Sequence, residues 1–554
     1  FGGADLQPLK RRGVPVLALA QDGTLYFDTH HTANDNLDKI DPAALDQAVA
    51  AYAVTAFLAA QAEDGFGRLE TPSGPEPFLY VDGQLPTFEV IDELTVRYSW
   101  QAPNPQFLPA LAQARPPFIY RPAHYLKRFH QDYGNPDEIA RLATEARVRN
   151  WAPLHNLKDD MYDMSNPDIP SLQPWIATPG GNDRRQVLVR NPYFHRISSA
   201  GQQLPYIDRI VVSVAEPSLI AAKTQAGESQ LQARGLNFSD IPVLKRGEAA
   251  RGYTTRLWPV SKANEIALYP NLTTKDPVWR EVLRDVRFRR ALSLAIDRNL
   301  VNRVLYFGLA IPMSNSLLPA SPLYEERFAK AYTEQDVDEA NRLLDEMGLT
   351  KRNREGIRLL PDGRPLDIIV ETAGENPIEI DALELVRDDW KKIGVGLYPK
   401  PSQRDVLRNR AFSGDLVMSV WSGFDNGIPT PEMSPDERVP VSTIFLSGPA
   451  WGAFVMSNGQ TGEKPEFEPA RTLLDAYYGW IGSTSDEERR AAWDTILATQ
   501  AEEVLSIGLV GGVSQPVVVN NSLRNVPEKG FYGWDPGAQF GIYRPDTFWL
   551  DAAN

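Results

Sequence analysis

The spacing of apolar residues predicts two amphipathic helices in the middle of the chain. Between residues 285 and 298 apolar side chains recur at three- and four-residue steps and share one face. They are Phe288, Ala291, Leu292, Ala295 and Ile296. A second helix is predicted over residues 337–348, where Gly348 stands at the position that ends a helix. Its apolar face consists of Val337, Ala340, Leu344 and Met347. Both patterns indicate helices packed on a core and give no information about a ligand.

Further along, the pattern predicts strands that alternate with a helix. Residues 366–370 form an apolar run, residues 378–393 have helical spacing, and residues 394–397 form a second short apolar run. A strand, a helix and a strand in this order favour parallel pairing through a crossover. Another strand is predicted over residues 415–418. This part of the chain is therefore predicted to be an α/β domain.

Two strand signals precede these elements. Residues 88–100 alternate between polar and apolar positions, as paired strands do. The apolar run 207–214 follows a turn at Asn191 and Pro192, and it predicts a buried strand.

The start of the chain has a separate pattern. Residues 1–63 are predicted to form a small α/β appendage, with a strand over residues 14–19 and a helix after Pro42. Residues 64–76 are rich in Gly and Pro and have no period, which is typical of a linker. The chain begins at Phe1 without an initiator Met, so its natural N-terminus is expected to have been processed, trimmed or never included.

Length, charge and cysteine content narrow the possible functions. With 554 residues the chain is expected to form at least two lobes, because single cores rarely grow beyond about 250 to 300 residues. The net charge of -15 disfavours nucleic acid and anionic lipid surfaces as partners. Cysteine is absent, which excludes disulfides and thiolate metal sites. No apolar run reaches the roughly 18 residues of a membrane-spanning helix, so direct membrane insertion is not expected.

Several blocks of sequence resemble a known family. Three of them read RNPYF at 190–194, QLPYIDRI at 203–210 and AKTQAGE at 222–228, and the two helices described above add two more. In this order they resemble the family 5 extracellular solute-binding proteins of ABC importers, a class that includes dipeptide- and oligopeptide-binding proteins.

The resemblance implies a two-lobed, periplasmic binding protein-like α/β fold that traps solute in an interlobe cleft. It implies a periplasmic, monomeric protein without cofactor or enzymatic activity. Such a protein captures a peptide or an oligosaccharide and delivers it to the permease subunits of the transporter. The sequence itself leaves the identity of the solute open.

The resemblance begins at about residue 77 and also implies domain limits. Lobe I is expected to comprise residues 77–265 and 508–554, and lobe II residues 266–507. Family members normally open with a strand-rich segment that contains a Trp-Ser-Asp-Gly turn, which does not occur here. An incomplete first lobe is therefore expected.

The appendage carries a second resemblance and an alternative function. Residues 31–35 read HTAND, and with their flanks they resemble the last segment of co-catalytic zinc aminopeptidases. The final zinc ligand of that family maps onto His31. The other ligands and the Glu general base lie upstream in the family and are missing here. The segment is therefore expected to be a remnant without metal, and a zinc-dependent aminopeptidase is kept as the alternative.

The candidate solute-binding residues lie mainly in one loop. In peptide-binding members of the resembled family, an Asp in this loop pairs with the amino terminus of the peptide, and Asp425 is the nearest candidate. Asn426 follows it in place of the usual Asp-Pro-Asp continuation. Trp421 has the residue type that stacks on a sugar or a side chain, although a Trp after an apolar strand is also typical of a core. The remaining candidates are Asn264, Tyr269 and Trp451, although residues of these types more often serve packing or lie on the surface.

Overall fold

A computed structural model of the chain describes residues between 79 and 551. Residues 80, 82–83, 93–94, 105–106, 112–120, 162, 179–183, 375, 458 and 535 are excepted. The predicted appendage 1–63, the linker 64–76 and the remnant site at His31 lie outside the described residues.

The largest sheet has five strands in the order β11-β10-β12-β8-β13. Their bounds are β8 Ala267–Pro270, β10 Asp367–Thr372, β11 Gly396–Pro401, β12 Met418–Trp421 and β13 Ile507–Gly508. β10 pairs in parallel with β11 and with β12, whereas β8 runs antiparallel to both of its neighbours. The predicted strand, helix and parallel strand are confirmed, because α15 (Pro377–Lys392) connects β10 to β11.

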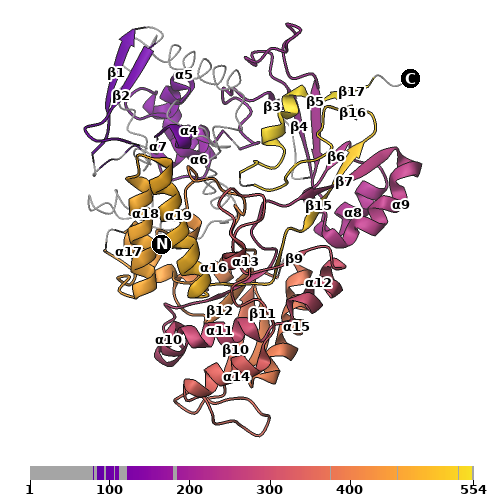
Figure 1. Cartoon of the computed structure of the whole chain (residues 1–554). Helices are drawn as coiled ribbons and strands as arrows, with labels where there is room; N and C mark the ends of the chain where they lie inside the picture. Colours follow the sequence, from indigo (N-terminus) through magenta and orange to yellow (C-terminus); the bar gives the residue numbers. More distant parts are fainter. Residues whose placement is uncertain are drawn as a thin grey trace.

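Helices surround this sheet in the lower half of the molecule (Figure 1). They are α10 Pro277–Arg284, α11 Val286–Leu294, α12 Arg298–Tyr306, α13 Glu326–Ala329, α14 Val337–Glu346, α16 Arg404–Phe412, η6 Asp436–Arg438, α17 Pro449–Met456, α18 Glu468–Ile481 and α19 Asp486–Glu502. Two short strands, β9 (Ile311–Pro312) and β14 (Val510–Gly511), pair beside them. We refer to this assembly, residues 266–511, as the lower body.

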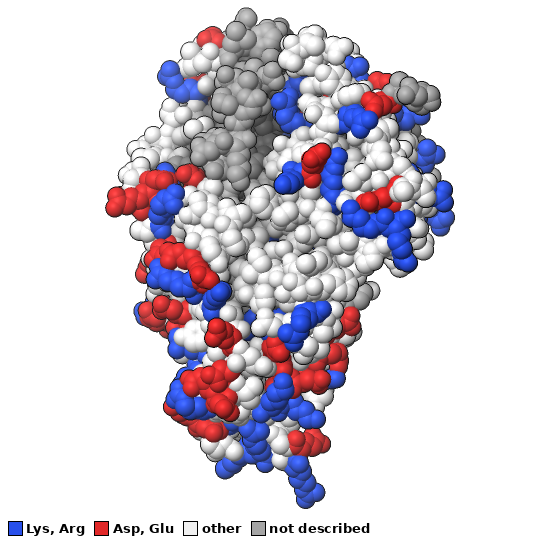
Figure 2. All heavy atoms as spheres, turned by 45° about the vertical axis from the view of Figure 1, so that its right-hand side comes forward, with Lys and Arg blue, Asp and Glu red and all other residues white. Residues whose placement is uncertain are grey.

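The main core of the molecule lies in the lower body. All five residues of the first predicted face are fully buried there, although α11 ends at Leu294 and Ala295 and Ile296 lie just beyond it. Leu344 of α14 joins them. Gly348 has φ +80°, the left-handed conformation that ends a helix at low cost for glycine. Both predicted helices are confirmed. On the surface, side chains of both signs are interspersed over the lower part of the face in Figure 2.

Two three-stranded sheets lie in the upper right of Figure 1. One has the order β6-β15-β7 and the other the order β3-β4-β5. The elements of this region are β3 Trp175–Ala177, β4 Arg185–Arg190, β5 Arg209–Ser213, α8 Pro217–Gln225, β6 Leu231–Gln232, η5 Phe238–Asp240, α9 Ile241–Arg251, β7 Tyr253–Pro259, β15 Ser514–Asn520, β16 Leu523–Arg524, η7 Gly541–Tyr543, η8 Pro545–Thr547 and β17 Trp549–Leu550. The chain leaves this region after β7 and returns to it at β15.

The prediction of a buried strand over residues 207–214 is wrong in its burial. The strand forms as β5, but Val211 and Val212 are each 45% exposed and Val214 is 59% exposed. Among the described residues β5 pairs only with β4, so it forms an edge of its sheet. An apolar run can therefore form a strand whose side chains remain accessible when no described element covers them.

A third region lies in the upper left of Figure 1. It contains β1 Thr87–Asp92, β2 Thr95–Ser99, α4 Phe107–Leu111, α5 Ala123–Leu126, η4 Lys127–Phe129, α6 Pro136–Glu145 and α7 Trp151–Asp159. β1 and β2 pair antiparallel, as the alternation over residues 88–100 predicts. The helices have a small core of their own around Leu126 and Leu154, both fully buried. The limits of lobes I and II that the sequence resemblance implies remain predictions.

Candidate functional site

The carboxyl ends of three parallel strands converge at one edge of the five-stranded sheet. β10 ends at Thr372, β11 at Pro401 and β12 at Trp421. In open α/β sheets this edge is where ligands usually bind. The segment 422–430, which follows β12, and α16, which follows β11, both begin at this edge. We call residues 421–430 the β12 loop.

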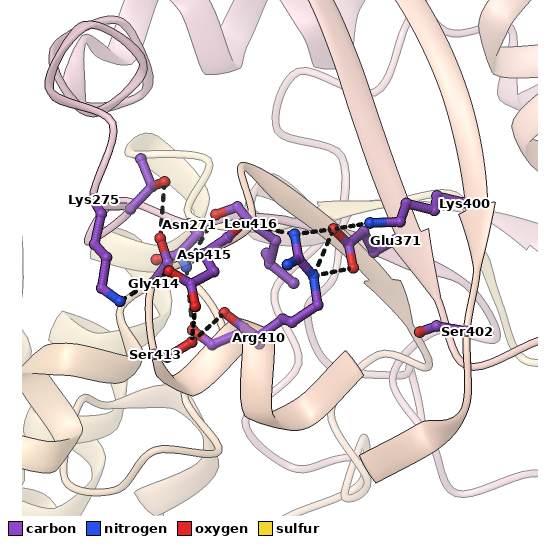
Figure 3. Close-up of polar contacts among 12 residues, drawn as sticks. Asn271, Lys275, Glu371, Lys400, Ser402, Arg410, Ser413, Gly414, Asp415 and Leu416 are labelled. Atoms are coloured by element: carbon purple, nitrogen blue, oxygen red, sulfur yellow. Dashed lines mark hydrogen bonds and ion pairs between the residues drawn. The ribbon is translucent and has the colours of Figure 1, made fainter. Parts of the chain in front are cut away.

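A buried carboxylate fixes α16 against the sheet (Figure 3). Glu371 of β10 accepts two hydrogen bonds from Arg410 of α16, with Nε 2.9 Å from Oε2 and Nη2 2.8 Å from Oε1. Lys400 of β11 lies 3.3 Å from the same carboxylate. Burial raises the pKa of Glu371, but the hydrogen bonds and charges of Arg410 and Lys400 together hold it below its ordinary value. Glu371 therefore stays ionised and keeps α16 at a fixed position.

Two arginines of α16 face the ring of Trp421. The guanidinium carbon of Arg404 lies 5.2 Å from the ring centroid, and that of Arg408 lies 5.5 Å from it. These distances are within the range of cation–π attraction. Trp421 is half-buried, as are both arginines. The ring also packs against the apolar cluster that contains Leu407 and Ala411, so it lies between this cluster and solvent in a cationic environment.

Asp425 and Asn426 form the middle of the β12 loop. Asp425 is half-buried, and Asn426 is buried, with its Oδ1 accepting a hydrogen bond from the Ile428 N–H at 3.0 Å. The N–H groups of both residues donate to the carboxylate of Glu437 on η6. The backbone of the turn that carries Asp425 is therefore fixed from inside the protein.

Two glycines let the β12 loop pack directly on the segment that joins β7 to β8. Gly423 N–H donates to the carbonyl of Asn264 at 2.9 Å, and Gly427 N–H donates to that of Ser261 at 2.6 Å. A Cβ at Gly423 would lie 2.6 Å from the Asn264 nitrogen, and one at Gly427 would lie 2.7 Å from the Ala263 nitrogen. Such distances are too short for any side chain, so both positions require glycine.

Asn264 and Tyr269 hold the β12 loop in place through hydrogen bonds. Asn264 is fully buried, and its Nδ2 donates to the carbonyl of Ser314 at 2.7 Å. The Tyr269 hydroxyl donates to the carbonyl of Ser422 at 2.8 Å. Burial raises the pKa of Tyr269, so the phenol remains a donor at physiological pH. Five of the six predicted site residues are thus gathered around one loop, and their solute-binding role stays a prediction.

Trp451 has different surroundings. It is 1% exposed and belongs to the main core. Its ring stacks on Phe467 with centroids 5.6 Å apart, and its Nε1 donates to Glu463 at 3.2 Å. These contacts account for the residue through packing.

Sequence reasoning missed two arginines and the half-buried acid Glu437 near the β12 loop. Arg404 and Arg408 are four residues apart at the start of a helix that follows a strand end, which places them on one helix face. That spacing was available in the sequence. Glu437 offered no such signal, because its contact with Asp425 depends on how residues 431–436 fold back.

Comparisons with known proteins define the class. A solved structure of oligopeptide-binding protein OppA is 30% identical, with a TM-score of 0.61, and the match covers 84% of this chain and 75% of that one. The structure of the periplasmic binding protein MelB from Agrobacterium fabrum C58 with stachyose is 19% identical, with a TM-score of 0.63 over 86% of this chain and 68% of that one. The fold is that of the two-lobed periplasmic binding proteins.

The sequence comparisons then give the family. The family model described as bacterial extracellular solute-binding proteins, family 5 Middle, matches residues 50–436. The chain belongs to this family, and the match begins inside the segment 1–63. The periplasmic alpha-galactoside-binding protein of Rhizobium meliloti (strain 1021) is 22% identical over 476 residues, which are 82% of this chain and 62% of that protein. The chain thus spans less than two thirds of the length of this curated relative.

Proposed function

We propose that the chain is the solute-binding component of a bacterial ABC importer and that its solute is a short peptide. Membership of family 5 supports the importer role. The peptide assignment rests on one observation: the β12 loop carries Asp425 in its middle and Trp421 at its start, where Arg404 and Arg408 face the Trp421 ring. A peptide has an amino group and a carboxylate, which such opposite charges recognise.

The remaining parts of the proposal follow from this role. The protein acts outside the cytoplasm, in the periplasm, as a monomer that delivers its solute to permease subunits. It makes and breaks no covalent bond. No helix within the described ranges is long and apolar enough to cross a membrane, and no group of three or more potential metal ligands occurs within them. The comparisons lend no support to a zinc aminopeptidase.

An oligosaccharide is the second candidate solute. The half-buried ring of Trp421 favours it, because an aromatic face stacks on the apolar face of a sugar. Similarity to a protein named for alpha-galactoside binding and to one solved with stachyose also supports it. Asp425 and the two arginines would then act as hydrogen-bonding groups rather than as charge partners.

A thermal-shift screen separates the two solutes. Trialanine and pentaalanine represent peptides, N-acetyl-trialanine removes the amino charge, and stachyose represents the sugars. A ligand that binds the folded state raises the melting temperature in proportion to its occupancy. We expect a shift of several degrees with a free peptide, a smaller one with the acetylated peptide and none with stachyose. A shift with stachyose alone would indicate that the solute is an oligosaccharide and not a peptide. The absence of a shift with every compound would contradict both candidate solutes.

A further inference from the structure

The short helix η6 holds the β12 loop by hydrogen bonds from its side chains to the loop backbone, at two N–H groups and one carbonyl. Glu437 Oε2 accepts from the Asp425 N–H at 2.7 Å, and Oε1 accepts from the Asn426 N–H at 3.3 Å. Its neighbour Arg438 donates to the carbonyl of Asn426. Two successive residues of η6 therefore fix the turn that carries Asp425.

η6 is itself anchored in the lower body. Arg438 is 1% exposed, and its guanidinium carbon lies 4.4 Å from the Phe424 ring centroid and 5.5 Å from that of Trp493 on α19. Gln500 of the same helix donates to the Arg438 carbonyl. The Glu437 carboxylate is thus presented from a rigid support, and any change in its hydrogen bonding acts on the loop rather than on η6.

We propose that Glu437 is the positioning residue of the β12 loop, and that its carboxylate form holds Asp425 in the orientation that receives solute whereas its protonated form releases the turn. A carboxylate accepts both N–H groups, because each of its oxygens is an acceptor. The protonated acid has one hydroxyl, and its hydrogen bonds to N–H groups lose the added strength of a charged acceptor. The part of this proposal that concerns solute rests on the proposed function.

The charges around Glu437 determine the pH range of this effect. Burial raises the pKa of Glu437, the charge of Arg438 lowers it, and the charges of Asp425 and Asp436 raise it; together these effects bring the pKa to about 7. Tyr269 of β8 also faces this group and remains neutral. Glu437 is therefore mostly ionised at pH 8.5 and mostly protonated at pH 5.5, so the loop should be held more firmly at the higher pH.

Amide hydrogen exchange of residues 421–430 tests the proposal without any solute. Wild-type protein is compared with Glu437→Gln and with Glu437→Asp, which keeps the charge, at pH 5.5, 7 and 8.5. Exchange rates are corrected for their intrinsic pH dependence. For wild type we expect protection of the loop amides to be about fivefold greater at pH 8.5 than at pH 5.5, the effect of exchanging a charged for a neutral acceptor. Glu437→Gln should show no such rise, and Glu437→Asp should retain part of it.

Control measurements keep the result interpretable. Glu466→Gln alters an exposed carboxyl paired with Lys464 and should behave as wild type. If Glu437→Gln does not fold, the pH dependence of loop amide protection in the wild-type protein still tests the proposal. Equal corrected protection at pH 5.5 and 8.5 in wild type, or the same rise in Glu437→Gln as in wild type, would overturn the proposal.

Titration with trialanine extends the test to binding. The amine of trialanine itself titrates near pH 8, so affinities are expressed per concentration of its charged form. On that scale we expect wild-type affinity to be about fivefold higher at pH 8.5 than at pH 5.5 and nearly constant for Glu437→Gln. If trialanine does not bind at any pH, the peptide assignment fails while the exchange result stands. If it binds with equal affinity at both pH values although protection changes, the link between the loop and solute is refuted.

Discussion

The strands of the lower body and β5 have similar apolar sequences but opposite surroundings. Met418, Ser419 and Val420 of β12 are each at most 2% exposed. Val211 and Val212 of β5 are each 45% exposed. Because adjacent residues of a strand point to opposite faces of a sheet, β12 is covered on both faces and β5 is partly open on both. The difference shows that the exposure of a strand is determined by the elements that pack against it and not by its own sequence.

The comparison also explains where the candidate site lies. The β12 loop begins at the end of a fully packed strand, and it is held by β8, η6 and the segment that joins β7 to β8. A solute-binding group on such support loses little freedom when it binds. The edge strand β5 offers no comparable support among the described residues.

The largest expected effect comes from opening the core of the lower body. Trp390 of α15 is 0% exposed, and its Nε1 donates to the Leu292 carbonyl at 3.0 Å. Trp390→Ala should destabilise this body by about 3 to 5 kcal/mol, because it leaves a cavity and an unpaired carbonyl. Urea denaturation followed by amide exchange of β10 and β12 measures the loss. A loss below about 1 kcal/mol would mean that the core repacks freely, and it would contradict the account of the lower body as more tightly packed than β5.

A second effect, restricted to the upper-left region of Figure 1, depends on pH. His155 of α7 is 1% exposed, and neither ring nitrogen has a hydrogen-bond partner among the residues that the structure describes. Burial, together with the nearby His130 and Arg121, lowers the pKa of His155 to about 4. The unfolded chain therefore binds a proton that the folded chain does not bind between about pH 6.5 and 4.

Stability of α5, α6 and α7 should therefore fall as pH falls through this window, by about 2 to 3 kcal/mol in total. Amide exchange of these helices at pH 7, 5.5 and 4 measures the fall. His155→Leu should remove most of it, whereas His124→Asn, at an exposed position, should leave it unchanged. An unchanged pH profile in His155→Leu would assign the effect to other groups.

The smallest effect comes from a matched pair of Val→Thr substitutions. Val420→Thr places a hydroxyl at a fully buried site and should cost about 1 to 3 kcal/mol. Val212→Thr, on the exposed edge strand, should change stability by less than about 0.5 kcal/mol. Denaturant midpoints of the two variants give the comparison directly. Equal costs would indicate that β5 is covered in solution.

The sequence predicts the lower body well because its signals are local. The face of α11 and the helix end at Gly348 follow from periodicity and glycine geometry, and the strand, helix and parallel strand follow from the order of elements. Burial of β5 was predicted wrongly, since an apolar run does not reveal whether another element covers it.

Within the candidate site, Trp421 and Asp425 could be selected from sequence because they are part of one short loop. Glu437 could not, because its role arises from a contact with Asp425 that only the folded chain creates. Trp451 has the residue type of a binding platform, yet its stacking on Phe467 arises only when the segment between α17 and α18 folds back on α17. Long-range packing therefore accounts for most of what the sequence left open.

The central claim is that the β12 loop binds the charged amino terminus of a peptide, and calorimetric titration with trialanine tests it most directly. The account predicts that trialanine binds wild type and that Asp425→Asn weakens binding by about 1.5 to 3 kcal/mol. Without ligand, the melting temperature should remain unchanged. N-acetyl-trialanine should bind both proteins weakly and equally, because it lacks the charge that Asp425 pairs with. Equal affinity of wild type for the free and acetylated peptides would contradict the claim, as would stachyose binding that Trp421→Ala abolishes and Asp425→Asn spares.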